Sequence, residues 1–272
     1  MKNGKSQSDP QWAHISTVFH ELAREASEAI LRHYRQPGKV RMKADATPVT
    51  DADEEANHLL VAGLMREFPG IPVLAEESAD VPARFGSKWL FVVDPLDGTK
   101  EYVKRNGEFS VNLALLENGM PAAGYIRIPV TGHCYSAVRG QGAWFCDEEA
   151  VPCEPQRIHV SDRTAGLILA VSRSHPSKEL DRLIRHAGIS RTIVSGSSLK
   201  GCLIARGIAD VYYRFGRTME WDTAAMQCIV EEAGGVMRQM DDSPMTYNKE
   251  IPENPIGFYV LNRLENRLHV DV

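Results

Sequence analysis

Residues 89–99 of this chain read WLFVVDPLDGT. Five consecutive apolar residues predict a buried strand, and the following Pro95 is incompatible with a helix interior. Gly98 permits a turn that a side chain would obstruct, so Asp94 and Asp97 are expected at the carboxyl end of a strand, where α/β proteins concentrate their ligand sites. Two carboxylates this close repel each other unless a cation lies between them, and such oxygen ligands suit Mg²⁺. A plain turn is the alternative, because Asp, Pro and Gly also favour turns for local reasons.

The composition is that of a globular protein of 272 residues, with 43% hydrophobic and 25% charged residues. A net charge of −5 argues against a nucleic-acid partner, although a small anion could still bind in a local basic pocket. No apolar stretch approaches the roughly 20 residues that span a bilayer, and residues 1–10 lack the apolar segment of a secretory signal. The five cysteines show no C-x-x-C spacing, which favours reduced thiols. We therefore expect a cytoplasmic protein without an integral membrane segment, and contact with the inner face of the cell membrane is left open.

The spacing of apolar residues divides the chain into two halves. Helical periodicity covers 10–34 and 51–68, and Thr50 or Asp51 is the expected N-cap of the second helix. Strand-like runs follow at 71–74, 89–93, 111–117, 122–128, 134–138 and 143–145. After an acidic, proline-containing segment at 147–156, strands at 167–171, 192–194, 211–213 and 236–238 alternate with helices at 177–187, 197–206 and 223–233. This pattern predicts an N-terminal α+β half (9–146) and a C-terminal α/β half (156–272) that form one compact catalytic unit.

Four further motifs place polar residues at the ends of strands or the starts of helices. They are PVTDAD (48–53), AEES (75–78), GSSLK (196–200) and EWDTAA (220–225). Each also has a purely structural interpretation: acidic and hydroxyl residues cap helices, a Glu pair can occupy an exposed loop, and a lysine is commonly solvated. Coincidence explains their joint occurrence poorly.

The order EE, DPLDGT and WDTAA resembles the inositol monophosphatase superfamily of magnesium-dependent, lithium-sensitive phosphatases. The resemblance runs from about residue 12 to about residue 261 and extends to one branch, the bacterial 3′(2′),5′-bisphosphate nucleotidases. The motifs that carry it are DPLDGTKEY (94–102), KRNGEF (104–109), VSRSH (171–175), GSSLK (196–200) and RFG (214–216). The resemblance implies the α-β-α-β-α layered fold of sugar phosphatases. It also implies removal of the 3′-phosphate of adenosine 3′,5′-bisphosphate in sulfate assimilation, with action on its sulfated precursor as an extension.

The resemblance also implies a metal site and a way to activate water. Glu76, Asp94 and the backbone carbonyl of Leu96 would hold a first Mg²⁺, and Asp94, Asp97 and Asp222 a second. A third, looser Mg²⁺ would use Glu77 and Asp53. Thr99, oriented by Asp53, would position a metal-activated water that attacks phosphorus directly, without a phosphoenzyme.

Substrate contacts are expected from several further residues. The resemblance places Gly98, Thr99, Lys100, His175, Ser197, Lys200 and Arg214 against the substrate, together with the metal ligands Glu76 and Asp222. Inositol monophosphatases carry a glutamate shortly before their WD motif, where this chain offers Arg214, whose planar fork matches a phosphate. His175 is equally compatible with an ordinary loop residue. Asp51 and Glu220 depart from the family's pattern, and neither removes a catalytic group.

Two other functions are weighed against this hypothesis. The first is inositol monophosphatase or fructose-bisphosphatase activity on the same scaffold. The second is a non-catalytic, metal-binding relative, which would usually have lost a ligand or the water-orienting pair, whereas this chain keeps them all. The expected partner is a small bisphosphonucleotide, and the protein is expected to be a monomer or a homodimer.

Overall fold

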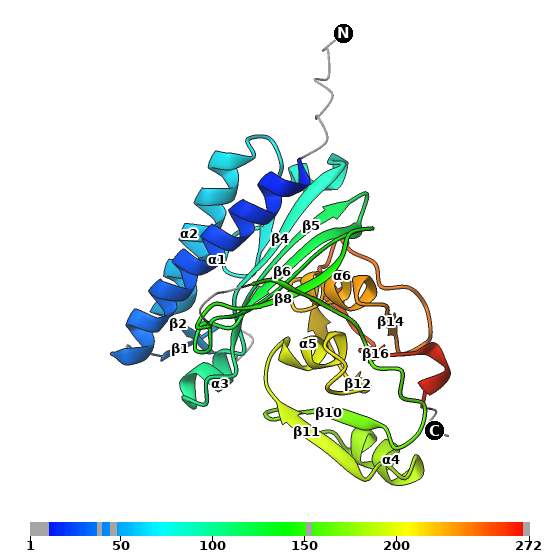
Figure 1. Cartoon of the computed structure of the whole chain (residues 1–272). Coiled ribbons are helices and arrows are strands. Elements are labelled where there is room, and N and C mark those ends of the chain that lie inside the picture. The colour runs from blue at the N-terminus through cyan, green and yellow to red at the C-terminus, as the bar shows by residue number, and fades with distance from the viewer. Residues whose placement is uncertain (1–10, 37–39, 44–47, 151–153, 269–272) are drawn as a thin grey trace.

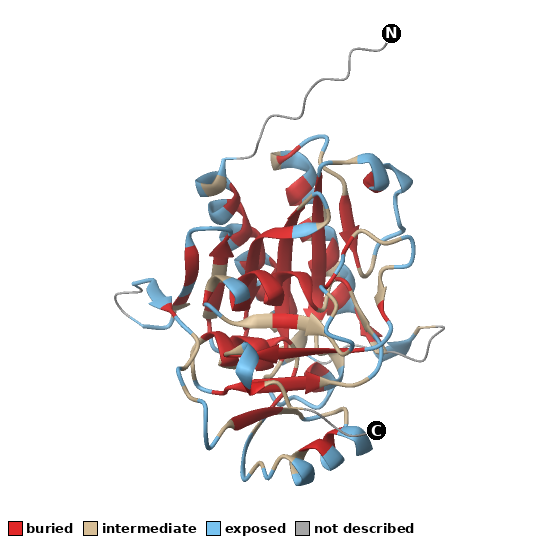
Figure 2. Ribbon diagram, turned by 90° about the vertical axis from the view of Figure 1, so that its right-hand side faces the viewer, coloured by how far each residue is buried: buried red, intermediate tan, exposed pale blue. Residues whose placement is uncertain are grey.

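Helices and sheets alternate in five layers in the computed structural model, which describes residues 11–36, 40–43, 48–150 and 154–268 (Figure 1). The layers are a helix pair, a seven-stranded sheet, a second helix pair, a five-stranded sheet and a single outer helix. This arrangement confirms the predicted α-β-α-β-α fold. Buried residues run through the sheets and the helix faces that contact them, whereas the outward helix faces are exposed (Figure 2).

The first two layers are α1 (Trp12–Arg35) and α2 (Asp51–Glu67) against a large sheet of order β3-β4-β5-β6-β7-β8-β9. The strands are β3 (Val73–Ala75), β4 (Trp89–Asp97), β5 (Ser110–Glu117), β6 (Met120–Arg127), β7 (His133–Val138), β8 (Gly142–Asp147) and β9 (Gln156–Ile158). Only β3 and β4 run parallel among these neighbours. A hairpin of β1 (Val40–Met42) and β2 (Pro48–Thr50) leads into α2.

Strand β4 is apolar on both faces because each face meets a different core. Phe91 and Val93 pack with α1 and α2, and Leu90 and Val92 pack with α6 (Ala224–Glu232) in the layer between the sheets. Because side chains alternate along a strand, Asp94 is expected on the same face as Leu90 and Val92. The strand therefore directs its first carboxylate toward the C-terminal half of the chain.

Helix α6 lies close against the large sheet at Gly124 of β6. A Cβ atom built on Gly124 would come within 2.6 Å of the carbonyl oxygen of Ala225 and 2.9 Å of the Cβ of Cys228. Real Cβ atoms essentially never make such short contacts. The absence of a side chain at this glycine therefore sets how near α6 approaches the sheet.

The C-terminal layers are α5 (Leu199–Ala205) beside α6, a five-stranded sheet of order β11-β10-β12-β16-β14, and α4 (Lys178–His186) outside it. The strands are β10 (Ile168–Ser172), β11 (Arg191–Ser195), β12 (Val211–Arg214), β14 (Val236–Gln239) and β16 (Phe258–Leu261). Short elements complete the chain: η1 (Pro82–Gly86), α3 (Thr99–Val103), β13 (Thr218–Met219), β15 (Glu253–Asn254) and η2 (Leu264–Asn266).

The structure extends the sequence-based predictions at several points. Strand β4 continues to Asp97, with an irregular register between Asp94 and Asp97, rather than ending at Val93. Strands β1, β2, β9, β13, β15 and β16 were not predicted. Cys146 is disulfide-bonded, so the expectation of reduced thiols is wrong there, whereas Cys134, Cys202 and Cys228 are buried free cysteines.

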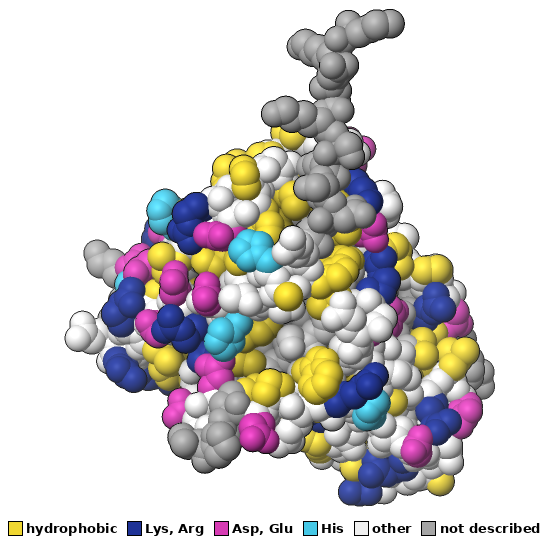
Figure 3. All heavy atoms as spheres, turned by 45° about the horizontal axis from the view of Figure 1, so that its top comes forward, with side chains coloured by type: hydrophobic (Ala, Val, Ile, Leu, Met, Phe, Trp, Pro, Cys, Tyr) yellow, Lys and Arg dark blue, Asp and Glu magenta, His cyan; other side chains and the backbone are white. Residues whose placement is uncertain are grey.

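The surface mixes charges of both signs. On the face seen in Figure 3, basic and acidic side chains are interspersed with apolar ones. Within the described ranges, no helix is both long and apolar enough to cross a membrane.

Candidate active site

Strand β4 and the turn after it form the floor of the candidate site. Asp94 is 1% exposed, and its Oδ1 accepts a hydrogen bond from the backbone N–H of Leu96 at 3.1 Å. Gly98 has φ +91°, and a Cβ there would lie 3.1 Å from the Cβ of Ser197. Glycine suits this left-handed turn into α3, and a side chain there would press against Ser197 of the C-terminal half.

Three carboxylates converge above this floor. One ligand atom from each of Asp94, Asp97 and Asp222 lies within 4.8 Å of the other two. Asp222 lies just before α6, 125 residues from Asp97, and its Oδ2 accepts a hydrogen bond from the backbone N–H of Met219 at 2.6 Å. The structure thus brings together three of the residues that the sequence predicts as metal ligands.

Asp97 joins the two halves of the chain. Its Oδ2 accepts hydrogen bonds from the hydroxyl of Ser197 at 2.6 Å and from both the hydroxyl (2.6 Å) and the backbone N–H (2.7 Å) of Ser198. Asn112 of β5 donates to the Ser198 hydroxyl at 2.9 Å, and Ser110 lies 2.6 Å from the Ser197 hydroxyl. One oxygen of Asp97 is therefore saturated with donors, which fixes the orientation of the other.

Burial and mutual repulsion raise the pKa values of the clustered carboxyl groups. Burial, then the charges of Glu76, Asp97 and Asp222, raises the pKa of Asp94 well above its ordinary value. Burial, then Asp97 and Glu76, raises the pKa of Asp222 to about 8. A bound cation would relieve this repulsion.

Glu76 and Glu77 follow β3 and share a lysine. The ammonium of Lys43 lies 2.8 Å from Glu76 Oε1 and 2.5 Å from Glu77 Oε1. Burial raises the pKa of Glu76 to about 7, although Lys43 opposes the rise. Lys43 was not predicted from the sequence, because a lysine just after a short exposed strand carries no signal of its own.

Asp53 and Thr99 lie together although 46 residues separate them. The Thr99 hydroxyl lies 3.2 Å from Asp53 Oδ1 and 3.3 Å from the carbonyl oxygen of Leu96. The other carboxylate oxygen of Asp53 accepts hydrogen bonds from the backbone N–H (2.8 Å) and the hydroxyl (2.5 Å) of Thr50. This contact caps the start of α2, and it confirms Thr50 as the N-cap. Burial raises the pKa of Asp53.

A cavity of about 460 Å³ opens over the carboxylates and has a basic side wall. Lys100, Lys200, Arg214 and His175 line it. Lys200 is buried. Its ammonium donates to the carbonyl oxygen of Ser197 and lies 5.3 Å from the centre of the Tyr212 ring. Burial lowers the pKa of Lys200 to about 8, and nearby Arg214 adds to the lowering. The cavity therefore pairs an acidic floor with cations.

The pKa of His175 reflects the cationic side chains close to it. Burial, then the charges of Arg214, Lys100 and Lys200, lowers the pKa of His175 to about 4. Its Nε2 lies 3.2 Å from the ammonium of Lys100, and its Nδ1 lies 3.3 Å from the Ser172 hydroxyl. The imidazole is thus neutral at neutral pH and is part of the cavity wall, although a role in binding stays a prediction.

Most sequence-predicted site residues line this one cavity. They are Glu76, Asp94, Leu96, Asp97, Gly98, Thr99, Lys100, His175, Ser197, Lys200, Arg214 and Asp222. Glu77 and Asp53 do not line the cavity, but they contact two residues that do, Lys43 and Thr99 respectively. Sequence reasoning missed Ser110, Asn112 and Ser198, whose hydroxyl and amide groups surround Asp97. The repeated serine of GSSLK was the available signal for Ser198.

The donor set suits a hard divalent cation. Asp94 Oδ2 is buried without a hydrogen-bond partner in the described part of the chain. It belongs to the cluster of three carboxylates, where an oxygen-preferring cation could satisfy it.

Comparisons with known proteins agree with this geometry. The model of the inositol monophosphatase family matches residues 11–256. The 3′(2′),5′-bisphosphate nucleotidase CysQ of Escherichia coli (strain K12) is 42% identical over 246 residues, which cover 88% of this chain and 96% of that protein. The crystal structure of CysQ from Bacteroides thetaiotaomicron superposes with a TM-score of 0.80 at 39% identity, covering 93% of this chain and 98% of that one. An inositol monophosphatase from Thermotoga maritima has a TM-score of 0.78 at 24% identity, covering 92% of each chain, which shows a shared fold.

Proposed function

The chain belongs to the inositol monophosphatase family, and from this premise we propose that it hydrolyses the 3′-phosphate of adenosine 3′,5′-bisphosphate to give AMP and phosphate. The family is metal-dependent, and the chain carries an acidic cluster to match. The observation that carries the proposal is the cavity itself, because carboxylates at its floor face cations on its wall. A substrate with two phosphates uses both: one phosphate reacts at the floor and the other binds the wall.

The proposed cofactor is Mg²⁺. Glu76, Asp94 and the Leu96 carbonyl would hold one ion, Asp94, Asp97 and Asp222 a second, and Glu77 with Asp53 a third, looser one. Divalent cations supply stabilisation of the negative charge that develops on the attacking and leaving oxygens of a phosphoryl group.

Thr99 and Asp53 are proposed to move the proton of the attacking water. The Thr99 hydroxyl donates to Asp53, which leaves its lone pairs free to accept a hydrogen bond from a water in the cavity. The proton of that water then passes to Thr99 while the hydroxyl proton moves to Asp53. Burial raises the pKa of Asp53, which makes it a stronger base than an exposed aspartate.

The basic wall is proposed to select the second phosphate. Lys200 and Arg214, with Lys100 beside them, offer charge-assisted hydrogen bonds to phosphate oxygens. Inositol 1-phosphate carries no second phosphate for this wall. The bisphosphonucleotide is therefore the better match, and its sulfated precursor presents the same 3′-phosphate.

The first experiment compares phosphate release from adenosine 3′,5′-bisphosphate and from inositol 1-phosphate in Mg²⁺, with and without Li⁺. Strong, lithium-sensitive preference for the nucleotide is expected. Preference for inositol 1-phosphate would keep the chemistry and refute the proposed substrate, and no release from either would refute both.

A second experiment tests the wall directly. Arg214→Met should lower kcat/KM for adenosine 3′,5′-bisphosphate roughly 10- to 100-fold, the value of a hydrogen bond to a charged group. It should leave kcat/KM for adenosine 3′-monophosphate nearly unchanged, because that substrate lacks the second phosphate. Arg217→Met is the matched control: Arg217 lines the same cavity but already pairs with Glu253 at 3.0 Å. Equal losses on both substrates would contradict the assignment of Arg214.

A further inference from the structure

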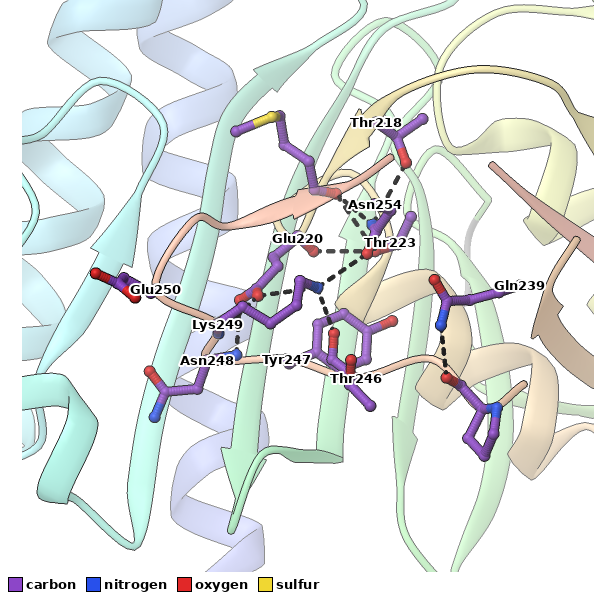
Figure 4. A network of polar contacts seen from close by, with 12 residues as sticks. Thr218, Glu220, Thr223, Gln239, Thr246, Tyr247, Asn248, Lys249, Glu250 and Asn254 are labelled. Atoms are coloured by element: carbon purple, nitrogen blue, oxygen red, sulfur yellow. Dashed lines mark hydrogen bonds and ion pairs between the residues drawn. The ribbon is translucent and has the colours of Figure 1, made fainter. Parts of the chain in front are cut away.

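Glu220 is a completely buried carboxylate two residues before Asp222. Its Oε2 accepts a hydrogen bond from the backbone N–H of Asn248 at 2.8 Å. Its Oε1 accepts one from the backbone N–H of Lys249 at 3.0 Å and lies 3.1 Å from the ammonium of Lys249 (Figure 4). A buried charge is costly unless it is paired and hydrogen-bonded, and all three of these donors come from the loop before β15.

The shape of this loop is adapted to the carboxylate. Asn248 has φ +62°, a left-handed conformation that few residues other than glycine adopt. Two successive backbone N–H groups, those of Asn248 and Lys249, thereby bind the same side chain. The backbone N–H of Glu220 also donates to the carbonyl oxygen of Pro252 at 2.9 Å. Both the main chain and the side chain of Glu220 are thus anchored to residues 248–252.

Arg84 fixes the other side of the loop. Its completely buried guanidinium donates to Asn248 Oδ1 at 2.7 Å and to the carbonyl oxygen of Lys249 at 2.8 Å. Its Nε and Nη2 groups also donate to the two carboxylate oxygens of Asp80, at 2.6 and 2.9 Å. Arg84 lies in η1, shortly after Glu76 and Glu77. The loop is therefore held between the segment that carries these two carboxylates and the segment that carries Asp222.

A chain of hydrogen bonds leads from the loop to Asp222. The Lys249 ammonium donates to Asn254 Oδ1 at 3.1 Å (Figure 4). The amide group of Asn254 donates to the carbonyl oxygen of Met219 at 3.1 Å and to the Thr223 hydroxyl at 3.2 Å. Met219, so held, donates its backbone N–H to Asp222 Oδ2 at 2.6 Å.

We propose that Glu220, with Lys249 and Asn254, is a positioning residue for the metal site. It fixes the strand β13 and the turn into α6, and through the backbone of Met219 it sets the direction of the Asp222 carboxylate toward Asp94 and Asp97. The inference rests on the metal-dependent activity proposed above. Residues that hydrogen-bond to metal ligands without touching the metal commonly control its affinity, and removing one typically weakens binding roughly 10- to 100-fold.

The test measures metal binding by the full chain rather than turnover alone. Glu220→Gln keeps the shape but removes the charge and sets an amide NH₂ against N–H donors. Binding of Mn²⁺, counted from the electron paramagnetic resonance signal of the free ion, should weaken roughly 10- to 100-fold. Excess Mg²⁺ should restore most of kcat, because the chemical groups are intact and only the affinity for the ion has changed.

The matched control is Asp210→Asn. Asp210 is equally buried and accepts hydrogen bonds from Arg163 at 2.6 Å and from the backbone N–H of Ile168 at 2.7 Å. It lies just before the first residue of β12, whereas the cavity residue Arg214 is the last residue of that strand. Asp210→Asn should lower the melting temperature and leave Mn²⁺ affinity unchanged. An equal loss of affinity in both variants would show a general effect of destabilisation and overturn the proposal.

Two further results keep the outcomes separate. If Glu220→Gln does not fold, Lys249→Met, which removes a partly exposed ammonium, must weaken Mn²⁺ binding in the same direction. Wild-type affinity in whichever folded variant is measured overturns the proposal. A wild-type chain that binds no Mn²⁺ would instead overturn the proposed function and, with it, this inference.

Discussion

Replacing Thr99 by valine would remove one hydroxyl from the cavity and keep nearly the same side-chain shape. The hydroxyl has a single proton, and its two acceptors, Asp53 Oδ1 and the Leu96 carbonyl oxygen, lie 3.2 and 3.3 Å away. Both distances are longer than the usual 2.7–2.8 Å for O–H···O contacts, so this hydroxyl contributes little to stability. If Thr99 transfers the proton of the attacking water to Asp53, kcat should fall roughly 10²- to 10⁴-fold. That loss corresponds to about 3–5 kcal/mol of barrier.

Thr50→Val provides the matched control, because Thr50 binds the other oxygen of the same Asp53 carboxylate. Loss of this helix cap should cost about 1 kcal/mol of stability. The backbone N–H of Thr50 would still hold Asp53, so most of kcat should remain. Steady-state phosphate release, melting curves and Mn²⁺ binding together separate the two variants.

Thr99→Val should bind Mn²⁺ as the wild type does, because the hydroxyl is not one of the three clustered carboxylates. Unchanged kcat would refute the proton-transfer role of Thr99. A loss of kcat matched by an equal loss of Mn²⁺ affinity would refute it as well, because Thr99 would then act through the metal site.

Three further outcomes follow from the same geometry. Asp94→Asn should abolish Mn²⁺ binding and raise the melting temperature of the metal-free protein, because it removes one charge from a buried, mutually repelling cluster; an unchanged melting temperature would contradict the repulsion. The metal-free protein should lose stability as the pH rises from about 4 to about 8. Glu76 (pKa 4.5 raised to about 7) and Asp222 (3.8 raised to about 8) bind more protons folded than unfolded in that window. Melting curves in chelator at pH 5 and pH 8 check this, and saturating Mg²⁺ should reverse the trend. Ser198→Ala should lower the free energy of unfolding by about 2 kcal/mol, because it removes a buried hydrogen bond to the Asp97 carboxylate. A loss within 0.5 kcal/mol, the level of an ordinary surface substitution, would contradict that contact.

Local patterns in the sequence predict much of this fold. The apolar stripes of α1 and α2, the Thr50 cap and the unbroken apolar run of β4 are patterns of neighbouring residues, which can be recognised without knowing what they pack against. Strands β13, β15 and β16 escape prediction because they are short or owe their pairing to partners far along the chain. Strand β16, for example, lies between β12 and β14 and follows both in sequence.

In the candidate site, too, only some of the residues are visible in the sequence. Carboxylates at strand ends and helix starts are visible in the sequence, and family resemblance orders them into one cluster. The groups that orient them are not visible: Ser198 and Asp97 are 101 residues apart, and Glu220 meets Lys249 only because the intervening helix and strand return the chain to it. Such pairings depend on the packing of whole layers, which no local pattern encodes.

Gly124 gives the site a dependence on a residue that touches none of its ligands. Helix α6 begins just after Asp222 and rests on β6 at this glycine, where even one methyl group would meet the Ala225 carbonyl oxygen at 2.6 Å. A side chain there must push α6 and the sheet apart, which changes the position of Asp222 relative to Asp94 and Asp97 on β4. The spacing of the three carboxylates thus depends on the distance between helix α6 and the sheet. A substitution at Gly124 would accordingly disturb the active site even though every catalytic residue was unchanged.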